Sequence, residues 1–130
     1  MKTTKAADVM TSQLITVTPD MLLTDVMKLL LRWHISGAPV VDENGKLLGI
    51  ISEIDLVNLA FSGNAADTTV DEAMTKNVTS FPPEAEMADL VHCFSSERLR
   101  RVPIVKDDKV VGIVSRRDIL REMLQRYEQI

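Results

Sequence analysis

The feature that most constrains this chain of 130 residues is an internal duplication. Met10-Thr11 aligns with Met74-Thr75 at an offset of 64 residues, and the offset falls to 63 after a turn that is one residue shorter in the second copy. The further matched pairs are Pro19 with Pro83, Asp25 with Asp89, Pro39 with Pro103, Gly49 with Gly112, Ser52 with Ser115, and Asp55 with Asp118. A match spread over the whole length of the unit indicates two copies of one α/β unit.

Both copies show the same order of hydrophobic patterns. A short apolar segment that ends just before a proline predicts a strand, and apolar residues at three- and four-residue spacing then predict a helix. Two β-branched runs joined by a tight turn follow, and Asn44-Gly45 is a strong hairpin signal in the first copy. The predicted ranges in the two copies are 14–17 and 78–81, 22–30 and 87–94, 38–41 and 102–105, and 47–51 and 109–114.

One such unit is too small to bury its own apolar face, so we expect the two copies to share a core. The predicted fold is α/β (α+β), with two tandem β-α-β-β-α repeats packed sheet to sheet about a pseudo-twofold axis. We expect a single module over residues 1–130, with one repeat at 7–60, a polar connector at 61–70 and the second repeat at 71–125. Two related clefts between the repeats would be the natural place for ligands.

Composition excludes several function classes. A net charge of −4 argues against nucleic acid and anionic membranes as partners, because both require a broad basic surface. No apolar run is long enough to cross a bilayer or to act as a secretory signal, so we expect a cytoplasmic protein. His34, His92 and Cys93 lack the spacing of metal ligands, and we expect no metal site.

The same short motif follows both hairpins. Ser52 and Ser115 each stand where a strand ends, and Asp55 and Asp118 follow three residues later in the first turn of a predicted helix. The simplest interpretation is a capped helix whose early acid suits the positive end of the helix dipole. The functional interpretation is that each carboxylate accepts hydrogen bonds from a ribose diol, while the serine and the helix N-terminus meet a ribose or phosphate oxygen. Recurrence in both copies favours function.

The longer segments around this motif resemble a known family. Ile35–Val41 together with Gly49–Asp55 resembles a cystathionine-β-synthase (CBS) domain, and Leu99–Val105 with Gly112–Asp118 resembles a second one. The tandem resembles a Bateman module over about residues 7–125. The resemblance implies binding of AMP, ADP, ATP or S-adenosylmethionine in two clefts between the repeats, with no required cofactor and with Mg²⁺ able to accompany ATP.

The resemblance also implies a role for each matching residue. It assigns the ribose to Ser52 and Asp55 in one cleft and to Ser115 and Asp118 in the other. The first cleft would add Val78 and the Arg100-Arg101 region, and the second would add an adenine slot of Ser12, Ile35, Ser36 and Gly37.

Phosphates are assigned to Arg100, Arg101 and Arg117, although a cationic helix end is the simpler interpretation of the 97–101 segment. Because Ser36-Gly37 stands where the second copy has Arg100-Arg101, we expect the two clefts to differ in phosphate affinity.

The leading functional hypothesis is a regulatory module and not an enzyme, because the two repeats use nearly all of the chain. Such a module is expected to form a homodimer and to act on a separate enzyme or transporter. The alternative is a ligand-free dimerisation or partner-docking module. The sequence does not rank the adenosine ligands.

Overall fold

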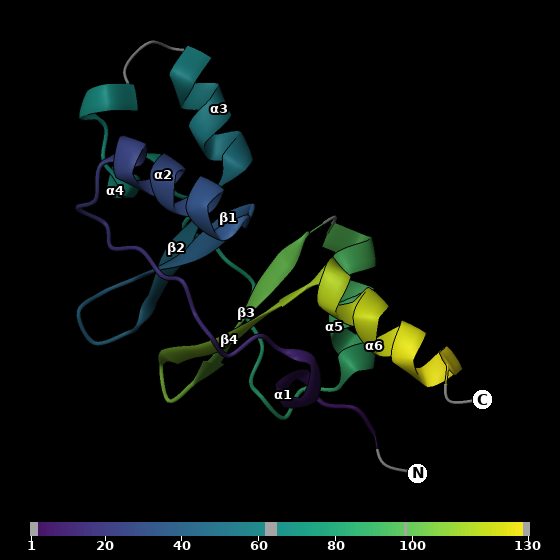
Figure 1. The fold of residues 1–130 in the computed structure, drawn as a ribbon. Coiled ribbons are helices and arrows are strands. Elements are labelled where there is room, and N and C mark those ends of the chain that lie inside the picture. The colour runs from purple at the N-terminus through teal and green to yellow at the C-terminus, as the bar shows by residue number, and fades with distance from the viewer. Residues whose placement is uncertain (1–2, 62–64, 98, 129–130) are drawn as a thin grey trace. The chain divides into compact units, whose positions relative to one another are not determined.

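The computed structural model describes residues 3–61, 65–97 and 99–128, in two compact units (Figure 1). We call Ile15–Val78 the Asp55 unit, and Met1–Leu14 together with Thr79–Ile130 the Asp118 unit. The Asp55 unit contains α2 (Leu23–Trp33), β1 (Gly37–Val41), β2 (Leu47–Ser52), α3 (Glu53–Phe61), a 3-10 turn η1 (Ala65–Asp67) and α4 (Val70–Ala73). The Asp118 unit contains α1 (Ala6–Val9), α5 (Met87–Glu97), β3 (Arg101–Lys106), β4 (Lys109–Ser115) and α6 (Arg116–Glu128).

Each unit is built around one antiparallel hairpin, β1 with β2 and β3 with β4. In the first hairpin Gly45 takes a φ of 84°, and the Asp42 carboxylate accepts hydrogen bonds from the backbone N–H groups of Asn44 and Lys46. In the second, Asp107 and Asp108 both have positive φ and form a two-residue turn. The predicted hairpins are confirmed, and the offset changes by one because the turn of the second hairpin is shorter by one residue.

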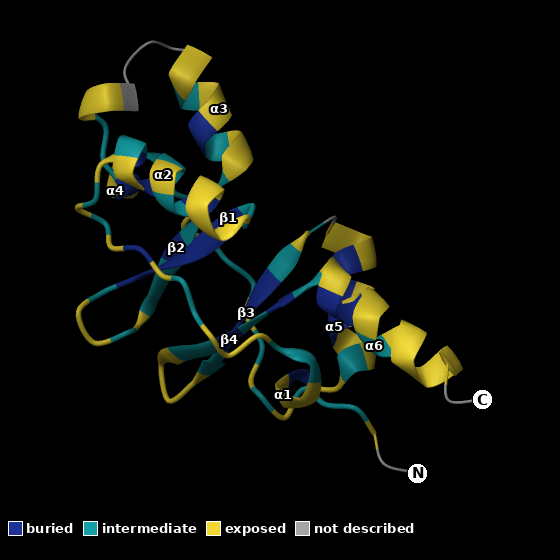
Figure 2. Cartoon of the chain, viewed as in Figure 1, coloured by how far each residue is buried: buried dark blue, intermediate teal, exposed yellow. Residues whose placement is uncertain are grey.

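The hairpin and its helices form a separate core in each unit. All five residues of β1 are buried (Figure 2), and Val40 and Ile51 pack with Leu23 and Val26 of α2. In the Asp118 unit, Ile104 and Val114 of the sheet pack with Leu90 of α5 and Ile119 of α6.

The segment that begins each sequence copy packs on the hairpin of the other copy. Thr75 exchanges two backbone hydrogen bonds with Ile50, each 2.9 Å long. Thr11 likewise exchanges two, of 2.9 and 3.0 Å, with Ile113. Residues 3–14 therefore complete the Asp118 unit, and residues 65–78 complete the Asp55 unit. The sequence repeats and the compact units thus divide the chain at different places.

Two glycines allow these segments to approach the strands. A Cβ on Gly49 would lie 2.5 Å from the Thr75 carbonyl oxygen, which is a steric overlap with backbone. A Cβ on Gly112 would overlap the Met10 side chain, at 2.8 Å from its Cγ. The Met-Thr pair of each copy therefore contacts the recurrent glycine of the other copy.

The first predicted strand of each copy is reduced to a single parallel bridge, Val17 with Val40 and Phe81 with Ile104. Two backbone hydrogen bonds accompany each bridge. In the first copy the Val17 and Val41 N–H groups donate to the carbonyl oxygens of Pro39 and Val17. In the second copy the Phe81 and Val105 N–H groups donate to those of Pro103 and Phe81. Pro19 and Pro82 end pairing because proline lacks an N–H. The prediction of a full strand at 14–17 and 78–81 is therefore wrong in extent.

The predicted connector at 61–70 contains Phe61 at the end of α3 and the turn η1, whereas its residues 62–64 lie outside the described residues. The connector ends as α4 begins at Val70.

Replacing Gly49 by alanine should destabilise the protein more than replacing Gly112. The Gly49 site faces a backbone carbonyl that is fixed by two hydrogen bonds, whereas the Met10 side chain can change rotamer. We expect a loss of about 2 kcal/mol for Gly49→Ala and roughly half of that for Gly112→Ala in urea unfolding. Equal losses, or a larger loss for Gly112→Ala, would contradict the contact geometry.

Candidate functional site

The recurrent serine and aspartate share the same two serine-to-aspartate hydrogen bonds in both units. The Ser52 N–H and Oγ donate to Asp55 Oδ2 at 2.9 and 3.0 Å. The Ser115 N–H and Oγ donate to Asp118 Oδ2 at 2.8 and 3.0 Å, and the Asp118 N–H donates back to Ser115 Oγ at 3.2 Å. We call both pairs capping boxes, with aspartate in place of glutamate; among the described residues the return bond from the aspartate N–H is present in the Asp118 pair alone. The simpler interpretation of the motif is therefore correct as a description of its local structure.

The hairpin fixes the position of each capped helix. Gly37 pairs with Ser52 in the first sheet, and the Glu53 N–H donates to the Ser36 carbonyl oxygen at 2.9 Å. Because strand and helix join without a loop, the aspartate is held at the end of the sheet.

The Asp118 unit repeats this arrangement. Arg101 pairs with Ser115, and the Arg116 N–H donates to the Arg100 carbonyl oxygen at 3.1 Å. Within its own unit, each capping box is therefore bordered by the segment that precedes the first strand of the hairpin.

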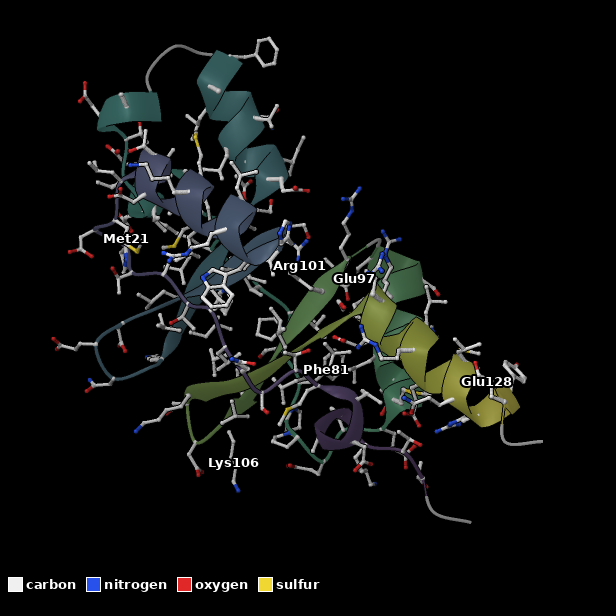
Figure 3. The ribbon with its side chains drawn as sticks, in the orientation of Figure 1. Met21, Phe81, Glu97, Arg101, Lys106 and Glu128 are labelled. Atoms are coloured by element: carbon white, nitrogen blue, oxygen red, sulfur yellow. The ribbon has the colours of Figure 1, made fainter. Side chains whose placement is uncertain are left out.

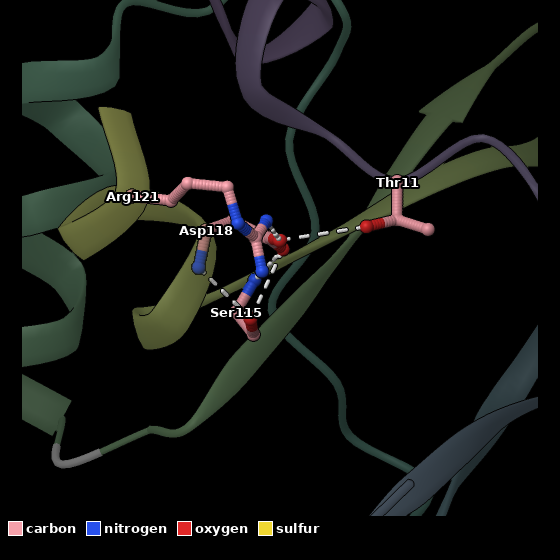
Figure 4. Close-up of polar contacts among 4 residues, drawn as sticks. All are labelled: Thr11, Ser115, Asp118 and Arg121. Atoms are coloured by element: carbon pink, nitrogen blue, oxygen red, sulfur yellow. Dashed lines mark hydrogen bonds and ion pairs between the residues drawn. The ribbon is translucent and has the colours of Figure 1, made fainter. Parts of the chain in front are cut away.

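The second carboxylate oxygen of Asp118 has two further partners (Figure 4). Thr11 Oγ1 donates to Asp118 Oδ1 at 3.4 Å, and Arg121 forms an ion pair with the same oxygen at 3.0 Å. Asp118 is 7% exposed and is the single charged residue in the core of the described chain. A buried carboxylate is costly unless it is paired, and these contacts meet that requirement.

Asp55 differs at this second oxygen. Among the residues that the structure describes, none donates a hydrogen bond to Asp55 Oδ1, and the side chain is half-buried. The counterparts of Thr11 and Arg121 are Thr75 and Asn58, and neither bonds Asp55. The two capping boxes therefore share their first carboxylate oxygen and differ in the second.

The remaining predicted site residues are divided between the two units. Ser12, Arg100, Arg101 and Arg117 belong to the Asp118 unit, while Ile35, Ser36, Gly37 and Val78 belong to the Asp55 unit. Figure 3 labels Arg101 where β3 begins, and Arg117 is exposed in the first turn of α6. The groupings that combine residues of both units stay predictions. Arg98, part of the basic segment noted in the sequence, lies outside the described residues.

Sequence reasoning missed Thr11 and Arg121 as neighbours of Asp118. The recurrence of Met-Thr in both copies pointed to Thr11, but spacing alone did not place it on the hairpin of the other copy. Little in the sequence singled out Arg121. It does not recur in the first copy, and a charged residue in a surface helix is ordinary.

The single cysteine is buried and unreactive in its setting. Cys93 Sγ lies 2.9 Å from Glu97 Oε2 on the next turn of α5. Burial, the hydrogen bond to Glu97 and the charge of that carboxylate raise the pKa of the Cys93 thiol to about 11. The thiol therefore stays protonated at neutral pH, which is unsuited to a nucleophile.

The described residues lack two other kinds of feature. Residues 3–61, 65–97 and 99–128 contain no group of three or more His, Cys, Asp and Glu side chains arranged to hold a metal ion. Over the same ranges, no helix has the length and apolar composition that a membrane crossing requires.

Comparison with family models matches the CBS domain twice, at residues 6–62 and 70–125. The chain belongs to the CBS domain family. The resemblance noted in the sequence is thereby confirmed, and so is the mixed helix-and-strand fold with two small antiparallel sheets. CBS-pair modules are regulatory, ligand-binding units in the proteins that carry them.

Two relatives show how this CBS pair compares with longer proteins. The chain is 34% identical over 128 residues to the inosine-5'-monophosphate dehydrogenase of Methanocaldococcus jannaschii, and spans 24% of that protein. It is 30% identical over 113 residues to the CBS domain-containing protein YhcV of Bacillus subtilis, covering 86% of this chain and 80% of YhcV.

Two solved structures of CBS pairs contain ligands. The CBS domain pair of protein MJ0100, in complex with 5'-methylthioadenosine and S-adenosyl-L-methionine, matches with a TM-score of 0.86 and 31% identity, over 96% of this chain and 99% of the other. CBSX2 in complex with AMP matches with a TM-score of 0.86 and 28% identity, over 93% and 96%.

The Cys93 thiol of this CBS pair should resist alkylation. With a pKa near 11, its thiolate fraction at about pH 8 is roughly a hundredfold below that of an ordinary thiol, and reactivity should rise only as the pH approaches 11. Iodoacetamide labelling followed by mass spectrometry measures this, with the urea-unfolded chain as control. Equal labelling rates in the folded and unfolded chains would contradict the burial and pairing of the thiol.

Proposed function

We propose that this chain is a sensing module that binds adenosine-containing ligands, with Asp55 and Asp118 as the acceptors for the ribose hydroxyls. The observation that carries the proposal is the capping box that is built twice. Each box holds a carboxylate at a helix N-terminus, and the serine donates to Oδ2 and not to Oδ1. Solved relatives of this size contain AMP, 5'-methylthioadenosine and S-adenosyl-L-methionine, and all three carry an adenosine group.

The chemistry of a ribose fits such a carboxylate. Adjacent 2'- and 3'-hydroxyls present two donors, and a carboxylate offers two oxygens with several acceptor positions. Hydrogen bonds to a charged acceptor are about twice as strong as neutral ones, so the diol would anchor the ligand. A helix N-terminus beside the ribose also favours a nearby phosphate.

The remaining predicted residues are proposed to complete the sites. Ser12, Ile35, Ser36, Gly37 and Val78 would contact the adenine, and Arg100, Arg101 and Arg117 would contact phosphates through their planar donor groups. The proposed binding requires no cofactor, and Mg²⁺ would enter only together with ATP.

The module is proposed to act by binding and not by catalysis. Ligand binding would favour one of two states of the module, and a separate enzyme or transporter would respond to that state.

We further propose that the module forms a homodimer through α3 and α6. Exposed apolar side chains recur at helical spacing on α6, at Leu120, Met123, Leu124 and Tyr127. On α3 they are Ile54, Val57 and Phe61. Contiguous apolar faces of this kind are typical of protein interfaces. The same faces also support the alternative function, a module that docks on a partner without any ligand.

Replacing Asp55 or Asp118 by asparagine should each remove one ligand site. Asparagine can still accept from the serine N–H, but it presents an amide N–H₂ donor where the ribose needs an acceptor. Calorimetric titration of the nucleotide-free protein with AMP should show loss of one site in each single variant and of both in the double variant. Asp25→Asn, in the exposed first turn of α2, is the control and should bind as the wild type does.

Wild-type affinity in the Asp55→Asn/Asp118→Asn double variant would show that these carboxylates do not hold the ribose. No heat from the wild type with AMP, ADP, ATP or S-adenosylmethionine would contradict the function itself and favour the ligand-free alternative.

Replacing AMP by 2'-deoxy-AMP should weaken binding by roughly tenfold or more, because one donor to a charged acceptor is lost.

A charge on the apolar face of α6 should weaken self-association. We expect Leu124→Glu to raise the dimer dissociation constant by roughly tenfold or more, because a buried charge would lack a partner. Gln125→Glu adds the same charge at the neighbouring exposed position and should leave the dimer intact. Sedimentation velocity measures both. A monomeric wild type, or equal effects of the two variants, would contradict dimerisation through this face.

A further inference from the structure

We infer that Arg121 competes with the ligand for Asp118, so that the Asp118 site binds an adenosine diol more weakly than the Asp55 site. This inference rests on the proposed function of the two carboxylates and adds a residue that sets the affinity of one of them. The inference follows from how many hydrogen-bond acceptor positions of each carboxylate are already occupied by donors of the described residues.

The acceptor positions of Asp118 are fully used. Its Oδ2 accepts from the Ser115 N–H and Oγ, and its Oδ1 accepts from Thr11 Oγ1 and from Arg121 (Figure 4). An ionised carboxylate has about four lone-pair positions, and all four are taken. A ligand diol must therefore displace at least one protein donor.

The acceptor positions of Asp55 are half used. Ser52 supplies both donors to Oδ2, and none of the described residues donates to Oδ1. The two hydroxyls of a ribose therefore find two open positions on this carboxylate. In this unit, binding does not require an existing ion pair to break.

The difference between the units is encoded at one helix position. Arg121 stands three residues after Asp118, and the residue three positions after Asp55 is Asn58, which carries no charge. Both units keep a threonine at the other neighbouring position, and the Thr11 bond is long at 3.4 Å. The arginine is thus the difference in sequence that accounts for the closed carboxylate.

The burial of the pair sets the size of the effect. The Arg121 side chain is 62% exposed, whereas that of Asp118 is 7% exposed. An exposed arginine can turn into water, so its ion pair is modest in strength and can be exchanged for ligand hydroxyls. The arginine therefore weakens this site by a limited factor without closing it.

A reciprocal exchange of the two residues tests the inference with adenosine, a neutral probe that has no phosphate to interact with arginine. In an Asp55→Asn background, where the Asp118 site remains, Arg121→Asn should tighten adenosine binding by about three- to tenfold in calorimetry. In an Asp118→Asn background, Asn58→Arg should weaken the Asp55 site by a similar factor. Arg126→Asn removes the same charge from the same helix, away from Asp118, and should change neither site.

Unchanged or weaker adenosine binding in Asp55→Asn/Arg121→Asn would overturn the inference, because the arginine would then be neutral or would support the ligand. That result leaves the proposed function standing as long as the Asp55 site still binds. Absence of adenosine and AMP binding by the wild type would instead overturn the proposed function and this inference with it. Thermal melts of every variant, compared with the wild type, establish that the measured affinities belong to folded protein.

Discussion

The rest of the structure around each proposed site depends on the hydrogen bonds from a serine to an aspartate three residues later. They end a strand, begin a helix and hold a carboxylate at the junction, with Oδ2 accepting from both the serine N–H and Oγ in each unit. Because the helix follows the strand without a loop, and the serine bonds one carboxylate oxygen, the position of the carboxylate is fixed by the hairpin. A group fixed in this way costs little entropy when it binds a ligand.

The contact between the Met-Thr segments and the hairpins links the two copies along the chain. Each segment leaves its own sequence copy and completes the unit built mainly from the other, where a glycine gives it room. A consequence is that the threonine beside Asp118 comes from the start of the chain, 107 positions away. The surroundings of each carboxylate therefore depend on both copies of the repeat.

Periodicity and turn chemistry predicted most of the local structure. The helices at α2 and α5, both hairpins and the serine caps follow from spacing and from residues such as Gly45 that tolerate a positive φ. The first strand of each copy was overpredicted, since an apolar run before a proline resembles a strand but pairs at a single bridge.

The partners of Asp118 were beyond the reach of the sequence. Thr11 is brought to it by long-range packing. The 3.0 Å ion pair of Arg121 becomes informative only by comparison with Asp55, to whose Oδ1 none of the described residues donates. The motif itself predicted a cap and a carboxylate, and the structure adds how many acceptor positions remain on each.

The most direct measurement is an NMR titration of the ¹⁵N-labelled protein with adenosine, following the backbone amides of Ser52 and Ser115. Both N–H groups donate to the carboxylates that are proposed to hold the ribose, so each reports on its own site. The account predicts that both signals shift, with Ser52 saturating at a lower adenosine concentration than Ser115. Signals that stay unperturbed, or Ser115 saturating first, would contradict it.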